Sequence, residues 1–146
     1  MKNFVNRLIY LRKEKGLNHV DIANQICLNA ETYKNYERGL CYPKLVTLLE
    51  LTEFYNVSLD YLAGLTDDRG EYRTMDVEQL PKRIIELRRQ SGMSQSAIAK
   101  QINVTKSGYK YYEMGKSIPP LPRLIALADL FGVSLDYLVG FNEMNI

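Results

Sequence analysis

The chain contains two copies of one sequence unit, and this internal repeat limits the possible folds more than any other feature. The ends of the copies are nearly identical, since residues 57–64 read VSLDYLAG and residues 133–140 read VSLDYLVG. The offset of 76 residues holds without a gap from Arg7 and Arg83 to Gly64 and Gly140. Two copies of roughly 60 residues indicate two small domains, because a solenoid usually needs at least about three repeats.

The repeat predicts a first domain over residues 1–66, a linker over residues 67–76 and a second domain over residues 77–146. The segment 66–74 is polar and charged and has no apolar periodicity. Asp76 is a good helix N-cap, and Pro81 is tolerated where it falls in or near a first helical turn. The first helix of the second domain is therefore expected to begin near these residues.

Apolar residues in both copies follow a helical spacing and do not alternate as in a strand. Phe4, Leu8 and Leu11 lie at i, i+4 and i+7, and Gly16 ends that helix. The further predicted helices cover residues 20–26, 30–38, 45–55 and a turn after Ser58, and in the second copy residues 84–90, 96–102, 106–114, 121–131 and 135–138. The expected fold class is all-α, with five short helices in each copy.

The composition is that of a globular protein, with 46% hydrophobic and 25% charged residues. The sequence has neither the run of roughly 18 apolar residues of a membrane span nor a signal peptide, so we expect a cytoplasmic protein without membrane association. Two cysteines and one histidine are too few for a zinc site with four such ligands. Because a phosphate loop and a nucleophile constellation are also missing, we expect no cofactor, no metal site and no enzymatic activity.

Positive charge is concentrated in the second copy. Residues 1–66 carry 8 basic and 7 acidic side chains, residues 67–80 carry 2 and 5, and residues 81–146 carry 9 and 5. A polyanionic partner is therefore expected to contact the second copy more strongly.

The middle of the second copy has the pattern of two short helices joined by a tight turn. Ser94 and Thr105 are N-cap residues, and Asn103 between the helices tolerates a left-handed turn. Tyr109 and Tyr112 lie at core spacing, as do Tyr33 and Tyr36 in the first copy. The outer face of the second helix carries Lys106, Ser107, Lys110 and Tyr111. Such a helix fits the major groove of DNA, where basic side chains meet phosphates and guanine edges.

Both copies closely resemble the Cro/repressor, or xenobiotic-response-element, family of phage-repressor helix-turn-helix domains. The resemblance covers most of the chain, and in the second copy it rests on an ordered series of residues: Leu87, Arg88, Gly92, Ser94, Gln95, Ile98, Ala99, Val104, Thr105, Tyr109, Tyr112, Glu113, Gly115, Pro119, Leu124 and residues 133–138. It implies two tandem five-helix DNA-binding domains joined by a polar linker. Members of this family usually act as dimers on double-stranded DNA.

The resemblance also implies roles for particular residues. Gln95 corresponds to a contact of the family with a phosphate or a base, and His19 has that place in the first copy. Recognition-helix contacts correspond to Lys106, Ser107, Lys110 and Tyr111, and in the first copy to Ala30, Glu31, Lys34 and Asn35. Lys116 corresponds to a phosphate contact of the family. The equivalent residue of the first copy is Leu40, which does not suit such a contact. A structural ion pair of the family corresponds to Arg12 with Glu37 and to Arg88 with Glu113.

Three residues depart from the favourable pattern. Glu31 would repel phosphates, although it could accept a hydrogen bond from cytosine. Cys27 stands at the turn position of Asn103 and tolerates a positive φ poorly. Gly108 weakens the second recognition helix by about 1 kcal/mol relative to alanine. We therefore expect the second copy to be the better DNA reader.

These observations predict a transcriptional regulator, more specifically a repressor, that contacts the major groove with one or both recognition helices. In one hypothesis the two copies bind two unlike half-sites as a monomer. In another, the first copy mediates homodimerisation and the second reads a half-site. A third hypothesis is a protein-interaction module, such as an antitoxin-like partner, with weak or secondary DNA binding.

Overall fold

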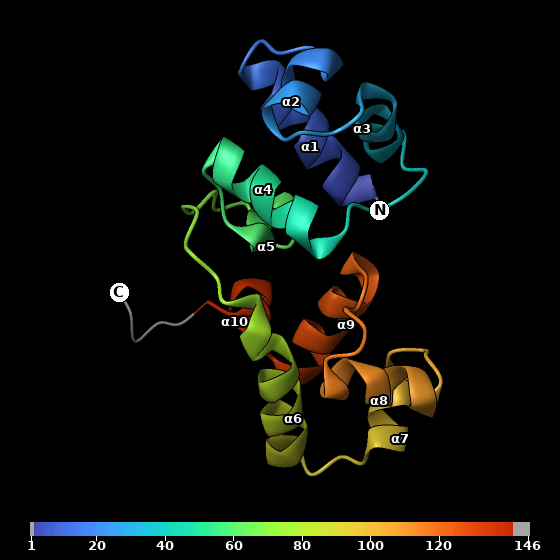
Figure 1. The fold of residues 1–146 in the computed structure, drawn as a ribbon. Helices are drawn as coiled ribbons and strands as arrows, with labels where there is room; N and C mark the ends of the chain where they lie inside the picture. Colours follow the sequence, from blue (N-terminus) through green and yellow to red (C-terminus); the bar gives the residue numbers. More distant parts are fainter. Residues whose placement is uncertain (1, 142–146) are drawn as a thin grey trace. The chain divides into compact units, whose positions relative to one another are not determined.

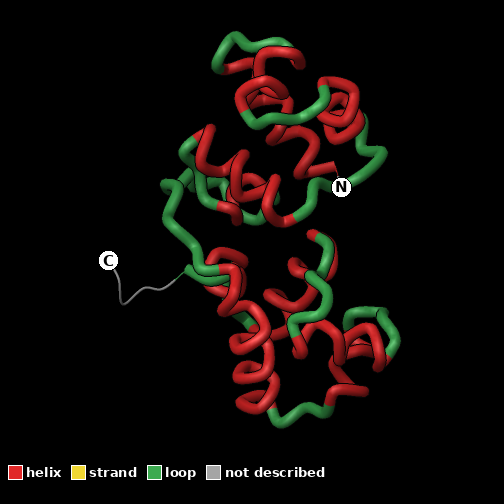
Figure 2. Tube along the Cα trace, in the orientation of Figure 1, coloured by secondary structure: helices red, strands yellow, loops and turns green. Residues whose placement is uncertain are grey.

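The computed structural model describes residues 2–141, and within this range the chain forms helices and no strand (Figures 1 and 2). It divides into two compact units, Met1–Arg73 and Thr74–Ile146. The prediction of an all-α chain with two tandem helix-turn-helix domains is confirmed. None of the helices described is long and apolar enough to cross a membrane.

Among its described residues, the first unit has five helices: α1 (Lys2–Glu14), α2 (His19–Gln25), α3 (Ala30–Glu37), α4 (Leu45–Tyr55) and α5 (Leu59–Leu62). Their apolar faces meet around Phe4, Leu8, Ile22, Tyr33 and Leu48, each of which is at most 2% exposed. The i, i+4 spacing of Phe4 and Leu8 places both on the face of α1 that is buried, because such residues share one side of a helix.

The second unit repeats this order with α6 (Leu80–Ser91), α7 (Gln95–Gln101), α8 (Lys106–Met114), α9 (Leu121–Phe131) and α10 (Leu135–Val139). A short 3-10 helix, η1 (Val77–Gln79), precedes α6. Asp76 caps η1 and not α6, since its side chain accepts a hydrogen bond from the Glu78 amide, and Pro81 lies in the first turn of α6. An additional turn, which the apolar periodicity does not predict, therefore precedes α6.

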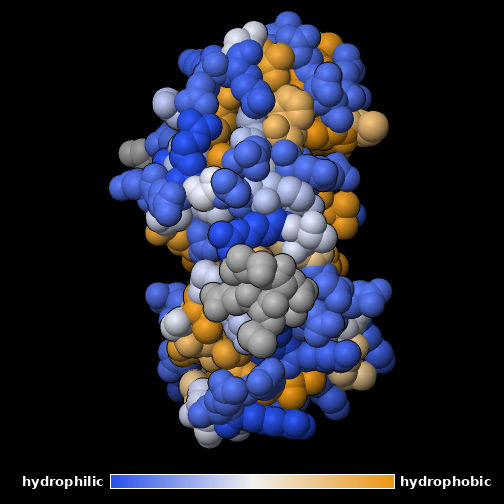
Figure 3. Space-filling view, turned by 90° about the vertical axis from the view of Figure 1, so that its left-hand side faces the viewer, coloured by the Kyte–Doolittle hydropathy of each residue, from blue (hydrophilic) through white to orange (hydrophobic). Residues whose placement is uncertain are grey.

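The aromatic core of the two units is similar but not identical. Tyr33, Tyr36 and Tyr109 are buried, as their spacing predicts, whereas Tyr112 is only half-buried. On the face of the molecule drawn in Figure 3, the surface is mostly hydrophilic and the hydrophobic areas are separate from one another. This distribution is expected when most large apolar side chains are inside the units.

The segment predicted as a linker, residues 67–76, contains no helix. Its first part contacts the first unit: the Ser58 amide donates a 2.8 Å hydrogen bond to the carbonyl oxygen of Arg69, and the Tyr72 amide donates a 3.0 Å bond to Asn56 Oδ1. The domain boundaries at residues 66 and 77 stay predictions.

Candidate nucleic-acid interface

The helix-turn-helix of the second unit consists of α7, a tight turn and α8, which pack against each other (Figure 1). Ser94 caps α7 by accepting from the Ala97 amide, and Thr105 caps α8 by accepting from the Gly108 amide. Between them Asn103 has a φ of +60°, a conformation that asparagine tolerates. Ala99 is 2% exposed, so its small side chain lies inside the unit. These local features fix how α8 is presented.

The outer face of α8 is polar and basic. Lys106, Ser107 and Lys110 are all exposed, and Tyr111 is 48% exposed. Lys116, just beyond α8, has its ammonium 5.9 Å from the centroid of the Tyr111 ring. No ion pair occupies any of these lysines within residues 2–141. The structure therefore brings the predicted recognition residues of the second copy onto one accessible surface.

The inner side of α8 is fixed by an ion pair. Arg88 Nε on α6 lies 2.6 Å from Glu113 Oε1, and the Glu113 side chain is only 4% exposed. The hydroxyl of Tyr109 also donates to Glu113 Oε1 over 3.3 Å. The hydrogen bond with Glu113 raises the pKa of Arg88, and burial followed by the Glu113 charge raises the pKa of Tyr109. Both groups therefore keep their protons over the physiological range.

Gln95 does not point away from the protein as a free DNA contact would. Its amide Nε2 donates a 2.6 Å hydrogen bond to Glu113 Oε2, the second oxygen of the buried carboxylate. Gln95 is half-buried as a result. A role for Gln95 in contacting DNA stays a prediction, and the structure adds an anchoring role that the sequence pattern did not suggest.

In the first unit, α2 and α3 form the corresponding helix-turn-helix. Asn18 caps α2 in a capping box with Asp21, and Asn29 caps α3 by accepting from the Glu31 amide. Cys27 has a φ of +56°, so it does adopt the left-handed turn for which it is poorly suited. The turn geometry is thus the same in both copies, although the residue that supports it differs.

The outer face of α3 is less basic than that of α8. Glu31 is exposed and its carboxylate lies 3.0 Å from Arg38 Nη1, which also contacts Asn35 Oδ1 at 3.5 Å. Lys34 and Asn35 are half-buried. Arg38 was not among the predicted site residues, although its position directly after α3 could have indicated it. The Glu31 carboxylate therefore partly neutralises the positive charge of Arg38.

His19 and Arg12 both meet the buried carboxylate of Glu37. Arg12 donates to Glu37 from Nε over 2.7 Å and from Nη2 over 3.0 Å, and this hydrogen bonding raises the pKa of Arg12. His19 Nε2 lies 3.3 Å from Glu37 Oε1, so His19 has the place that Gln95 has beside Glu113. The four residues predicted to form ion pairs thus lie in two equivalent pairs, one in each unit.

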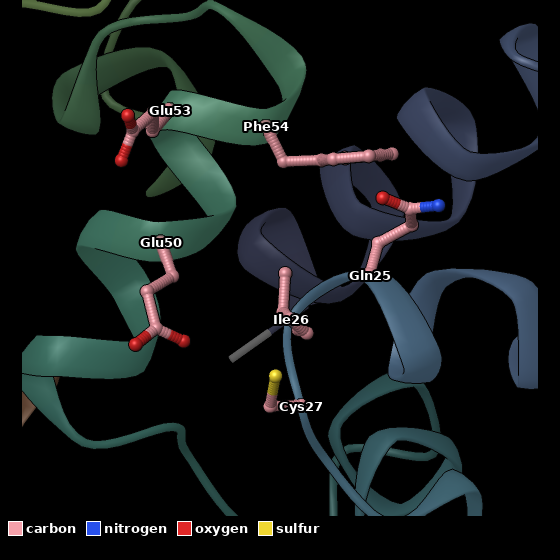
Figure 4. A pocket seen from close by; sticks show the side chains of 6 residues that line it. All are labelled: Gln25, Ile26, Cys27, Glu50, Glu53 and Phe54. Atoms are coloured by element: carbon pink, nitrogen blue, oxygen red, sulfur yellow. The ribbon is translucent and has the colours of Figure 1, made fainter.

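A pocket of the first unit lies beside the turn and does not include the predicted DNA contacts. It has a volume of about 360 Å³ and is lined by Gln25, Ile26, Cys27, Glu50, Glu53 and Phe54. Figure 4 shows the end of α2 and Cys27 on one side of the hollow and α4 on the other. Because Glu50 and Glu53 are acidic, this side of the unit is not suited to a polyanion.

The two units thus define a protein with tandem helix-turn-helix domains. The helix-turn-helix family profile matches the chain twice, over residues 8–62 and 84–138. The chain belongs to the helix-turn-helix family. The matched ranges include both pairs of central helices and the ion pairs behind them.

Several curated relatives resemble less than half of the chain. The chain is 36% identical over 62 residues to the uncharacterized HTH-type transcriptional regulator YobD of Bacillus subtilis. The match covers 42% of this chain and 55% of that protein. The chain is 39% identical over 61 residues to the cryptic phage CTXphi transcriptional repressor RstR of Vibrio cholerae, covering 42% and 55%. It is 33% identical over 66 residues to the HTH-type transcriptional regulator ImmR of Bacillus subtilis, covering 45% and 52%.

The chain therefore spans about half the length of the curated relatives that it matches. No solved structure shows significant similarity to the chain.

Proposed function

We propose that this chain is a transcriptional regulator, acting as a repressor in the cytoplasm, that binds double-stranded DNA sequence-specifically. The observation that carries the proposal is the exposed face of α8, where Lys106 and Lys110 lie on the outer side of a capped and internally anchored recognition helix. Lysines there meet phosphates and guanine edges when the helix enters the major groove. The relatives, described as transcriptional regulators and a repressor, support the same function.

The second unit supplies the main contacts, and the first unit supplies weaker ones. Lys116 follows α8, whereas the equivalent Leu40 cannot pair with a phosphate. Directly after α3 the charge of Arg38 is opposed by Glu31 at 3.0 Å. Because phosphate contacts dominate the affinity of DNA-binding proteins, this difference in charge favours α8 over α3.

The proposal is tested by binding the full chain to duplex DNA from the region upstream of its own gene. We expect the variant Lys106→Ala/Lys110→Ala to bind at least about tenfold more weakly, since each base or phosphate contact contributes on the order of 1–3 kcal/mol. The control Lys13→Ala/Lys82→Ala removes the same charge from exposed positions on the first helix of each unit. An equal loss in both variants would contradict a specific role of α8.

A second candidate function is homodimerisation through the first unit. Leu40 and Val46 are 69% and 60% exposed there, whereas the second unit has Lys116 and Pro122 at the equivalent positions. Large exposed apolar side chains of this kind occur in protein interfaces where they form a continuous patch. Sedimentation of the full chain at twice its 16.9 kDa, reversed by Leu40→Lys/Val46→Lys, would support it, and a monomer at all concentrations would exclude it.

A further inference from the structure

Arg69, which lies beyond the last helix of the first unit, is tied to the end of the first helix. Its guanidinium donates two hydrogen bonds to the Glu14 carboxylate, from Nη1 to Oε2 over 2.9 Å and from Nη2 to Oε1 over 2.8 Å. The same guanidinium lies 5.8 Å from the centroid of the Tyr61 ring. A bidentate pair fixes orientation as well as distance. Arg69 therefore connects the segment after α5 with the C-terminal turn of α1.

Hydrogen bonds on both sides of Arg69 attach the surrounding segment to the same unit. Arg7 Nη2 donates to the Thr66 carbonyl oxygen and to Asp67 Oδ1, both over 2.9 Å. Farther along, the Tyr72 amide donates to Asn56 Oδ1 over 3.0 Å. We call residues 67–72 the strap.

The strap approaches the first unit closely at Gly70. This residue has a φ of +59°, and a Cβ there would lie 3.1 Å from Cβ of Ser58. The neighbouring Ser58 amide donates to the Arg69 carbonyl oxygen over 2.8 Å. Glycine thus permits both the backbone conformation and the short distance that this hydrogen bond requires.

The second unit begins soon after the strap. The Asp76 amide donates to the Gly140 carbonyl oxygen over 3.4 Å, and a Cβ at Gly140 would collide with the Asp76 backbone. Arg73, Thr74 and Met75 lie between the two anchored positions, Tyr72 and Asp76. Since an extended chain advances at most about 3.3–3.6 Å per residue, these anchors are at most about 14 Å apart in any arrangement of the units.

The Arg69 contact is specific to the first copy. At the position of Arg7 the second copy has Arg83, which donates to other partners, the carbonyl oxygens of Tyr137 and Phe141. Glu14, by contrast, corresponds to Gln90, which cannot form an ion pair. The ion pair thus belongs to the copy whose last residues lead into the segment between the two units.

We propose that the Arg69–Glu14 ion pair, by anchoring the strap, fixes the spacing between two DNA half-sites that the chain can bind at once. This inference rests on the proposed function. A short tether raises the effective concentration of the second domain only at half-sites within its reach. If the strap is released beyond Asp67, which Arg7 still holds, nine residue steps to Asp76 reach about 30 Å, and the gain of about 16 Å corresponds to about five base pairs.

The test combines a selection with hydrogen exchange on the full chain. The variants are Arg69→Glu, which places two carboxylates together, and Glu14→Arg/Arg69→Glu, which restores an ion pair with the net charge of the original chain. Each protein is used to select binders from a duplex library with 40 random base pairs, about four helical turns. The spacing between the two enriched motifs is the readout, because it is independent of overall affinity. Exchange of the Ser58 and Tyr72 amides reports the strap without DNA.

We expect the original chain to select one spacing within about two base pairs, Arg69→Glu to accept about five base pairs more, and the double variant to return to the narrow range. Both amides should exchange at least about tenfold faster only in Arg69→Glu. An equal spacing range in the three proteins, unchanged exchange, or enrichment of a single motif would overturn the proposal. If the original chain enriched no motif, both the proposed function and the proposed control of half-site spacing would be contradicted. The exchange rates of the Ser58 and Tyr72 amides would still show separately whether the strap is anchored.

Discussion

The amide of Gln95 and the carboxylate of Glu113 are joined by a 2.6 Å hydrogen bond, and Arg88 holds the other oxygen of the same carboxylate at 2.6 Å. The start of α7 is therefore coupled to the inner side of α8 through one buried group. In the first unit Arg12 binds both oxygens of the Glu37 carboxylate, and His19 lies beside one of them. The orientation of each recognition helix thus depends on a carboxylate that the helix itself supplies.

Removal of one partner of this pair is expected to destabilise the second unit strongly. Arg88→Ala leaves the Glu113 carboxylate, whose side chain is 4% exposed, without its cation, and we expect a loss of about 3 kcal/mol in the free energy of unfolding. Urea unfolding followed by NMR signals of the second unit measures this loss. The control Arg89→Ala removes the exposed neighbouring arginine and should cost less than about 0.5 kcal/mol. Equal costs would show that the ion pair does not hold α8.

The turn of the first unit is expected to become more stable when its cysteine is replaced. Cys27 and Asn103 have φ angles of +56° and +60°, and asparagine tolerates this conformation better. Cys27→Asn should therefore raise the free energy of unfolding by about 0.5–1 kcal/mol, and Asn103→Cys should lower it by a similar amount. Urea unfolding of the two variants provides a reciprocal comparison. A change of the same sign in both would contradict the explanation from backbone strain.

Glu31 is expected to weaken DNA binding by the first unit. Its carboxylate lies 3.0 Å from Arg38, and its position in α3 corresponds to that of Ser107 on the proposed DNA-binding face of α8. Glu31→Gln removes this charge and should strengthen binding to duplex DNA by roughly three- to tenfold, because a repulsion from phosphates is lost and Arg38 becomes available. Fluorescence anisotropy measures the affinity, and Glu53→Gln, at an exposed position of α4, is the control. No difference between the variants would mean that α3 does not approach DNA.

Much of the fold follows from short-range signals in the sequence. The caps at Ser94 and Thr105 and the left-handed turn at Asn103 depend on residues only a few positions away, so the pattern predicts them directly. The extra turn η1 before α6 does not follow from apolar spacing, because η1 is a single turn held by the cap of Asp76.

The contacts of the candidate site could be predicted from the sequence only in part. The exposed face of α8 follows from helical spacing, and the lysines of that face are where the pattern places them. The contact of Gln95 with Glu113 joins residues 18 positions apart, and the strap joins Arg69 to Glu14 over 55 positions. Such contacts depend on how the helices pack, and no local propensity encodes them.

The salt dependence of DNA binding by the full chain measures directly whether the lysines of α8 contact the phosphates of duplex DNA. The logarithm of the binding constant for duplex DNA should fall linearly with the logarithm of salt concentration, and the slope should become shallower by about 2 in Lys106→Ala/Lys110→Ala, since each phosphate contact contributes about 0.9. The slope of Lys13→Ala/Lys82→Ala should stay as steep as that of the original chain. DNA binding through α8 would be contradicted if the full chain did not bind duplex DNA at about 50 mM salt, or if both variants had the slope of the original chain.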